Sequence, residues 1–163
     1  MSLRQVLESR VAAGQTEALG GVAFAPVLEL DSGRRYGLVL PPEDAEVGWA
    51  FAEGDRLVKF AKETARHFVE VLEHPRRELD DRIEREAASR GLPGDETLFS
   101  FPSVELVRAI LETRAAHFCN IALRWLLPTE LRELRADIQA VANDEELPEA
   151  LRDLAAHLVV PER

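Results

Sequence analysis

The sequence contains a single cysteine, Cys119, among its 163 residues, so no disulfide can form within the chain. Its first ten residues, MSLRQVLESR, mix charged with apolar side chains and lack the continuous apolar segment of a secretory signal. Charged residues also interrupt every run that approaches about 18 apolar residues, the length of a membrane-spanning helix. These absences exclude a disulfide-rich secreted fold. They favour a cytoplasmic protein that has no membrane partner.

The sequence also lacks the short motifs of the commonest enzyme classes. It contains no GxxxxGKS/T phosphate loop, GxGxxG turn, HExxH helix, GxSxG elbow or CxxC pair. His117 and Cys119 are residue types that serve as catalytic base and nucleophile, but residues two apart on a helix point about 200° apart and cannot face each other. We therefore expect a non-catalytic protein without a cofactor.

The net charge of −10 comes from two segments only. Residues 41–55 contain five acidic and no basic residues, and residues 130–163 contain nine acidic and four basic ones, whereas residues 56–129 contain twelve of each. Such acidic surfaces repel phosphate backbones, which argues against a nucleic-acid partner. A basic protein partner would fit them.

The stretch from Ser103 to Leu127 is predicted to be one long helix at the centre of the core. At 100° per residue its apolar side chains share one broad face: Val107, Ile110, Leu111, Phe118, Ile121, Ala122 and Trp125. A helix this apolar must be largely buried. We expect Phe118 and Ile121 to be inaccessible to solvent.

Five further segments follow the helical period. Ser2 and Gln5 match a capping box at the start of the first, and Asp55 is a suitable N-cap for the most amphipathic one, which ends before Pro75. The expected helices cover residues 3–13, 55–74, 76–90, 129–142 and 149–160.

A β-hairpin is predicted near the N-terminus. Residues 22–30 and 35–40 carry apolar side chains at alternating positions, and the turn-rich residues 31–34 lie between them. Residues 42–53 are ambiguous, because their Pro-Glu-Asp start suggests a helix whereas the alternation of Val47, Trp49 and Phe51 suggests a strand. We favour the helix.

Together these patterns predict a mainly α, α+β fold. It is a helical bundle-like domain of five to six helices with one β-hairpin insert near the N-terminus. A chain of 163 residues with 46% hydrophobic residues suits one sizeable core, so we expect a single domain over residues 1–163.

A metal site is the first alternative to a protein-binding function. His67, Glu70 and His74 lie along one edge of the helix predicted over residues 55–74, and His117 could supply a further ligand. Such a site would belong to a metal-dependent helical-bundle enzyme, of which a hydrolase is the favoured type. Because Glu and His pairs on a solvated helix edge also arise by chance, the sequence favours the solvated edge.

Arg114 is a charged residue within the apolar arc of the predicted central helix. An unpaired charge there would be very costly, so we expect a carboxylate or a bound anion within hydrogen-bond reach of its guanidinium. Arg114 is therefore the candidate binding residue. A small-anion-binding sensor centred on it is the second alternative.

Binding of another protein is the function that the sequence favours, as an adaptor, inhibitor, chaperone or immunity-type partner. We also expect a two-fold homodimer. Leu79, Ile83 and Ala87 form a stripe too narrow to anchor the helix over residues 76–90, and an isolated hairpin leaves its edges unpaired. A symmetric copy of the chain could satisfy both needs.

Overall fold

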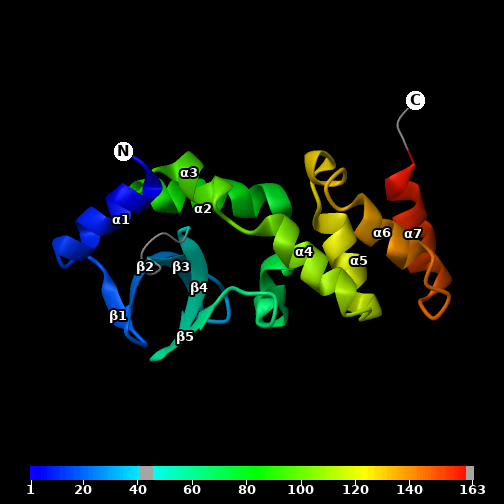
Figure 1. Cartoon of the computed structure of the whole chain (residues 1–163), viewed down its shortest axis with the longest axis horizontal. Helices are drawn as coiled ribbons and strands as arrows, with labels where there is room; N and C mark the ends of the chain where they lie inside the picture. Colours follow the sequence, from blue (N-terminus) through cyan, green and yellow to red (C-terminus); the bar gives the residue numbers. More distant parts are fainter. Residues whose placement is uncertain (41–45, 161–163) are drawn as a thin grey trace. The chain divides into compact units, whose positions relative to one another are not determined.

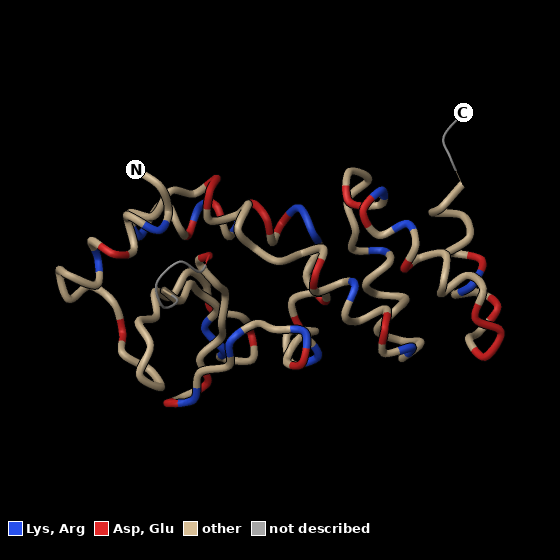
Figure 2. The backbone as a smooth tube through the Cα atoms, viewed as in Figure 1, with Lys and Arg blue, Asp and Glu red and all other residues tan. Residues whose placement is uncertain are grey.

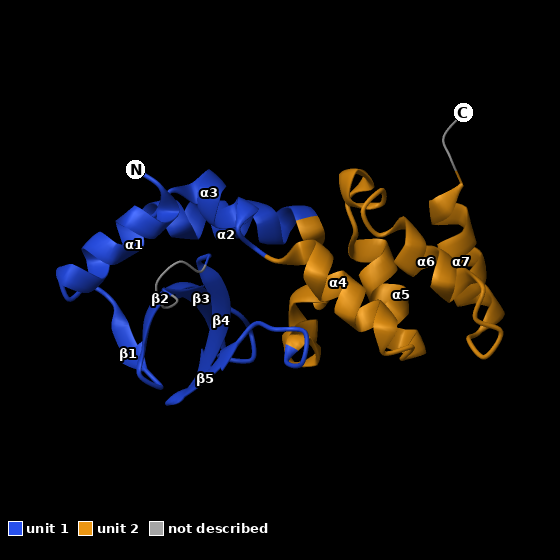
Figure 3. Ribbon diagram, viewed as in Figure 1, with its two compact units in different colours: residues 1–64, 77–101 blue, residues 65–76, 102–163 orange. Residues whose placement is uncertain are grey.

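The computed structural model describes residues 1–40 and 46–160, and the chain divides into two compact units (Figure 1, Figure 3). Unit 1 comprises residues 1–64 and 77–101, and unit 2 comprises residues 65–76 and 102–163. The chain therefore passes between the units three times. This division does not decide whether the chain is one domain, and the single domain over residues 1–163 stays a prediction.

Unit 1 is built on a five-stranded antiparallel sheet that curves into a half-barrel (Figure 1). The strands are β1 (Glu17–Leu19), β2 (Val22–Glu29), β3 (Arg35–Val39), β4 (Gly48–Glu53) and β5 (Arg56–Lys59). Each strand pairs with its neighbour in sequence, so the sheet is a meander made of local hairpins.

Glycines determine two of the hairpin turns. Gly20-Gly21 joins β1 to β2, and Gly54-Asp55 joins β4 to β5. Gly20, Gly21 and Gly54 have φ angles of 55°, 74° and 60°. Two-residue hairpin turns require this left-handed region, which glycine adopts without steric cost.

Both faces of the sheet are apolar. One face carries a buried cluster of Phe24, Val39, Ala50 and Ala52, surrounded by the partly buried Leu19, Val22 and Leu57. On the other face Tyr36 packs against Phe51, with ring centroids 5.5 Å apart, and Trp49 meets Phe101 edge to face at 5.0 Å. Burial on both faces explains why the strands contain few polar residues.

Three helices complete unit 1: α1 (Leu3–Ala12), α2 (Arg76–Ser89, of which Arg76 belongs to unit 2) and α3 (Gly94–Phe99). The capping box of Ser2 and Gln5 is confirmed. The Leu3 amide donates a hydrogen bond of 2.8 Å to Glu96 of α3, and Arg10 donates one of 2.7 Å to the Arg90 carbonyl just beyond α2. These bonds tie the three helices together.

The described residues of unit 2 form helices and their connections, and no strand. Its elements are η1 (Ala65–Glu73), α4 (Ser103–Glu112), α5 (Ala116–Trp125), η2 (Pro128–Glu130), α6 (Arg135–Ala142) and α7 (Glu149–Val159), where η marks a 3-10 helix. Helix α4 packs against η1, α5 and α6, and α5 packs against η1 and α7. The core side chains of α4, which are Leu106, Val107, Ile110 and Leu111, are buried. Of the described helices, none has the length and apolar character to cross a membrane.

The prediction of a helical bundle with one hairpin insert is wrong. The described chain combines a five-stranded sheet with seven α-helices, which is an α+β fold. The hairpin over residues 22–40 exists as β2 and β3, but it is only part of the sheet. Within residues 42–53 the strand β4 replaces the favoured helix, because Trp49 and Phe51 alternate with small residues and pair with β3. Residues 41–45 lie outside the described residues.

The helix predicted over residues 55–74 is also wrong. Gly54-Asp55 closes a hairpin, so the residues of β5 extend the sheet instead of starting a helix. Within this segment the helical part is Ala65–Glu73, which forms the 3-10 helix η1. The helical period of residues 57–61 was overridden by strand pairing.

The central helix predicted over residues 103–127 is broken into α4 and α5. Arg114 lies in the break with a φ of 57°, which an α-helix cannot contain. The prediction that Phe118 and Ile121 are inaccessible is wrong, since Phe118 is 37% exposed and Ile121 is half-buried. Because the chain changes direction at the break, the apolar side chains of α4 and α5 do not share one continuous helix face.

The remaining helices are close to their predictions. Those over residues 3–13, 76–90 and 149–160 are confirmed as α1, α2 and α7, and the one over residues 129–142 is divided between η2 and α6. The stripe of Leu79, Ile83 and Ala87 is buried within the single chain. The two-fold homodimer stays a prediction, but this stripe no longer requires it.

Gly37 of β3 offers a test of the sheet. A Cβ at this position would lie 2.2 Å from the Ala25 carbonyl oxygen, at the irregular pairing of β2, whereas one at Gly48 would meet only the Val39 side chain at 3.2 Å. We expect Gly37→Ala to lower the free energy of unfolding by about 3 kcal/mol and Gly48→Ala to change it by less than about 1 kcal/mol. Urea denaturation followed by circular dichroism measures both, and equal losses would contradict the tight approach of β2 to β3.

Candidate functional site

The four residues of the alternative metal site belong to two helices and to the residue that follows one of them. His67 and Glu70 lie in η1, His74 follows it directly, and His117 lies in α5. Within residues 1–40 and 46–160, no three His, Cys, Asp or Glu side chains are close enough to hold a metal ion. The metal-dependent enzyme therefore gains no support from the geometry.

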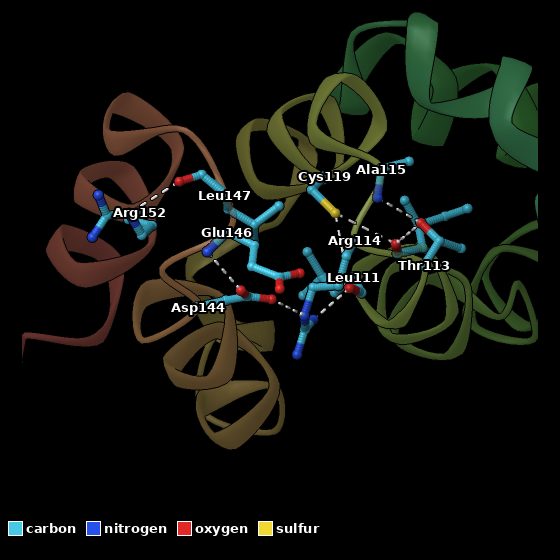
Figure 4. A network of polar contacts seen from close by, with 10 residues as sticks. Leu111, Thr113, Arg114, Ala115, Cys119, Asp144, Glu146, Leu147 and Arg152 are labelled. Atoms are coloured by element: carbon cyan, nitrogen blue, oxygen red, sulfur yellow. Dashed lines mark hydrogen bonds and ion pairs between the residues drawn. The ribbon is translucent and has the colours of Figure 1, made fainter.

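Arg114, the predicted binding residue, has a carboxylate partner (Figure 4). Its Nε lies 3.2 Å from Oδ2 of Asp144 in the α6–α7 connection, and its Nη1 donates to the Leu111 carbonyl. A carboxylate within hydrogen-bond reach was predicted for Arg114, and Asp144 confirms it. Asp144 already compensates the charge of Arg114, which weakens the attraction of this guanidinium for a further anion.

The neighbours of Arg114 complete the end of α4 (Figure 4). The last carbonyls of a helix have no partner in a following turn and need donors from elsewhere. The Thr113 hydroxyl donates to the Ile110 carbonyl at 2.6 Å, and the Cys119 thiol lies 3.5 Å from the same oxygen. The polar contacts around the break therefore provide donors for the last carbonyls of α4.

Cys119 is fully buried behind this break. Burial raises the pKa of the Cys119 thiol, because the apolar surroundings disfavour the thiolate, and the nearby Arg114 charge offsets this only in part. A thiol with a raised pKa and no access to solvent is a poor nucleophile. We assign Cys119 to the core.

A bidentate ion pair of low exposure lies elsewhere in unit 2. Nη1 and Nη2 of Arg76 donate to the two carboxylate oxygens of Glu130 at 2.9 and 2.6 Å, and Nη2 also donates to the Ser103 hydroxyl at 3.2 Å. The side chains of Arg76 and Glu130 are only 10% and 14% exposed. Paired guanidinium and carboxylate groups in this geometry are among the stronger polar contacts in proteins.

Trp125 completes this arrangement, which we call the Arg76 frame and define as Arg76, Ser103, Trp125 and Glu130. The Arg76 guanidinium carbon lies 4.2 Å from the centre of a Trp125 ring, within range of a cation–π interaction. The indole N–H of Trp125 donates to the His74 carbonyl at 3.2 Å. The frame therefore fixes the end of α5 against the segment that follows η1.

Two prolines explain how the sequence positions the frame. Pro75 separates η1 from α2, and the His74 carbonyl between these two helices accepts from Trp125. Pro128 starts η2, where Glu130 turns back to accept from the Leu127 amide at 3.1 Å. Each turn therefore directs one partner of the ion pair.

A surface pocket of about 270 Å³ adjoins the Arg76 frame. The pocket is an open depression, and its apolar lining consists of Leu72, Pro75, Ile121 and Trp125, of which Leu72 and Trp125 are only 4% exposed. Its polar lining consists of Glu73, His74, Arg76 and Arg124. An apolar cavity of about 150 Å³ already accommodates benzene. The pocket is therefore large enough for an aromatic or branched aliphatic side chain.

Arg124 is the cation of the pocket that lacks an acidic partner. Its Nε donates to the Asn120 side chain of the same helix at 3.2 Å, and its guanidinium forms no ion pair with a carboxylate of the described residues. Arg76, in contrast, is neutralised by Glu130. The exposed Arg124 can therefore bind an incoming carboxylate without breaking an existing pair.

The Arg76 frame makes a prediction about stability. Removing one partner of a buried ion pair leaves the other charge uncompensated, so Arg76→Met and Glu130→Gln should each lower the free energy of unfolding by about 2 to 4 kcal/mol. The double variant should lose less than the sum by at least about 1 kcal/mol.

The pair of Arg108 with Asp137 in the same unit is a matched control. It is 3.3 Å long, with side chains that are 40% and 25% exposed. Its disruption should cost less than about 1 kcal/mol. Urea unfolding of the double-mutant cycle measures both pairs, and additive losses at Arg76 and Glu130 would show that the frame is not coupled.

Cys119 makes a prediction about reactivity and pH. The buried thiol should react with a disulfide reagent at least about a hundredfold more slowly in the native chain than in urea, because reaction requires opening of the fold. An acid whose pKa is raised on folding contributes stability that is complete below its unfolded pKa of about 8.5 and is lost as pH rises through the folded pKa. Stability should thus fall with alkaline pH more steeply for the wild type than for Cys119→Ala, and identical slopes would contradict the raised pKa.

The Arg76 frame and its pocket were not found from the sequence. Pro75 and Pro128 marked the two turns, but the two charges of the ion pair are 54 residues apart, and no local pattern connects them. No family model matches the chain, and no curated protein or solved structure matches it either. The geometry of unit 2 is therefore the basis for a function.

Proposed function

We propose that this chain is a non-catalytic protein-binding module whose unit 2 pocket receives an apolar side chain of a partner protein, next to a carboxylate of that partner. The observation that carries the proposal is the pocket itself. It combines an apolar surface, an aromatic wall that is held in place by the Arg76 frame, and one unpaired arginine. Pockets of this kind bind by burying one anchor residue and orienting it with few polar contacts.

The frame lowers the cost of binding. Trp125 is fixed by its bond to the His74 carbonyl and by the Arg76 guanidinium on its ring, so it loses little freedom when a ligand contacts it. Because Trp125 is ordered before binding, the binding free energy is not reduced by the entropy lost in ordering this side chain. The pocket therefore has the character of a preformed site.

The polar lining selects the chemistry of the partner. Arg124 can donate to a carboxylate, and Glu73, on the wall supplied by η1, can accept from a backbone or hydroxyl donor. Arg76 adds no free charge, because Glu130 compensates it. The favoured ligand is thus an aromatic or aliphatic side chain close to an acidic residue.

The acidic segments support a separate contact. Figure 2 shows acidic residues gathered at the α6–α7 connection. The sequence there contains Asp144, Glu145, Glu146 and Glu149, of which Asp144 is paired with Arg114. A basic protein surface would complement this connection, as the charge distribution predicts. Both contacts suit a partner in the cytoplasm, where the lone buried thiol of Cys119 would stay reduced.

A matched pair of small probes tests the pocket. N-acetylphenylalanine carries an aromatic ring and a carboxylate, and N-acetylphenylalaninamide carries the same ring without the charge. Burial of one phenyl side chain contributes about 1.5 to 3 kcal/mol, so we expect the amide to bind with a dissociation constant of about 10 mM to 100 mM and the acid, which can also pair with Arg124, to bind several-fold more tightly.

Nuclear magnetic resonance provides the readout, because the chain has only two tryptophans. The indole N–H signal of Trp125 should shift on titration, and that of Trp49 in unit 1 should not. Arg124→Gln should remove the preference for the acid, whereas Ile121→Glu should abolish binding of both probes. The pocket would be excluded as a binding site if neither probe moved the Trp125 signal, or if both indole signals moved alike.

A further inference from the structure

Phe99 is the most exposed large apolar residue away from the chain termini in the described residues. It is the last residue of α3 and is 92% exposed, whereas Phe101, two residues later, is buried against Trp49. Full exposure of a phenylalanine forgoes about 2 kcal/mol of burial. The position of Phe99 is therefore unfavourable for the isolated chain in water.

The residues around Phe99 are firmly held. The buried Thr97 donates to the Pro93 carbonyl at 2.7 Å, and Ser100 donates to the Thr97 carbonyl at 2.7 Å while it accepts from the Trp49 indole at 2.9 Å. Gly94 packs so closely on α2 that a Cβ there would lie 2.7 Å from the Glu84 carbonyl oxygen. The fold thus presents Phe99 outward on a rigid base, as a preorganised anchor is presented at an interface.

Asp95 lies on the same side of α3 as Phe99, because the two are four residues apart. Both are exposed, and no basic residue occurs between Arg90 and Arg108. The surface of α3 therefore combines an aromatic side chain with a nearby carboxylate. This is the chemistry that the unit 2 pocket favours, with Ile121 and Trp125 for the ring and Arg124 for the acid.

We infer that the chain self-associates by inserting Phe99 of one copy into the unit 2 pocket of a second copy, with Asp95 directed to Arg124. The inference rests on the proposed function of the pocket and names a second copy of this chain as a ligand for it. It uses different surfaces from the hairpin edge and the stripe of Leu79, Ile83 and Ala87 that the sequence suggested for a dimer. Size, apolarity and charge match on the two sides of the contact.

Sedimentation equilibrium at micromolar to millimolar concentrations measures the association. The apparent mass of the wild type should rise with concentration above the 18.2 kDa of one chain. Phe99→Ala should weaken association at least tenfold and leave the fold intact, because the side chain is exposed. Val11→Ala removes another exposed apolar side chain, on α1, and should leave the association constant unchanged.

Mixing two variants tests which surfaces meet. Phe99→Ala retains an intact pocket, and Ile121→Glu retains an intact Phe99, so each alone should be monomeric while an equimolar mixture should form one-to-one dimers. Arg124→Glu, at an exposed position, replaces Ile121→Glu if that variant loses its circular dichroism signal. Isotope labelling of the Phe99→Ala partner should show its Trp125 signal shifting on mixing.

Three results would overturn the inference: a wild type that stays at 18.2 kDa, a Phe99→Ala variant that associates as tightly as the wild type, or a mixture that does not recover association. The probe titration, repeated on Phe99→Ala, separates these outcomes from failure of the proposed function. If N-acetylphenylalanine still shifts the Trp125 signal while the wild type stays monomeric, the pocket binds a different partner and only the self-association is wrong.

Discussion

The bidentate pair of Arg76 with Glu130 is the interaction on which the candidate site depends. It connects the residue after Pro75 to the turn that Pro128 starts, and its guanidinium also contacts the Trp125 ring. Two charges at such low exposure are tolerated only because each is compensated by the other and by further hydrogen bonds. Since these partners come from segments far apart in the chain, the pair fixes the wall of the pocket only once unit 2 has folded.

The fold provides hydrogen-bond partners for polar groups but leaves some apolar groups exposed to solvent. Polar side chains at some element ends have partners, as Thr113 and Arg114 do at the end of α4 and Ser100 does after α3. The ring of Phe99 and part of the apolar lining of the pocket are left to solvent, whereas Leu72 and Trp125 in that lining are largely buried. Uncovered apolar groups on a firmly held base are characteristic of a binding surface, and their exposure is compatible with stability because the cores beneath them are complete.

The net charge of the chain does not decide which ion its pocket can bind. The chain carries a net charge of −10, yet Arg124 is the pocket residue free to take a new ionic partner. Overall charge governs solubility and long-range attraction, whereas a pocket responds to the few groups within hydrogen-bond reach. An acidic ligand segment and a basic partner surface are therefore compatible on one molecule, at the pocket and at the α6–α7 connection respectively.

The sequence by itself determined those elements whose signals are local. The capping box at Ser2, the turn over residues 31–34 and the amphipathic helices α2 and α7 all follow from residues a few positions apart. The glycine turns at residues 20–21 and 54–55 are an equally local signal for two further hairpins, but at residues 54–55 the helical period that follows Asp55 favours a helix instead. Only the tertiary structure decided that residues 56–59 join a sheet, that Arg114 ends a helix on Asp144, and that Arg76 meets Glu130 across 54 residues. The physical reason is that periodicity reports which side of an element is apolar, whereas the partner that covers it, and the carboxylate that meets a given arginine, depend on contacts between segments that no local pattern encodes.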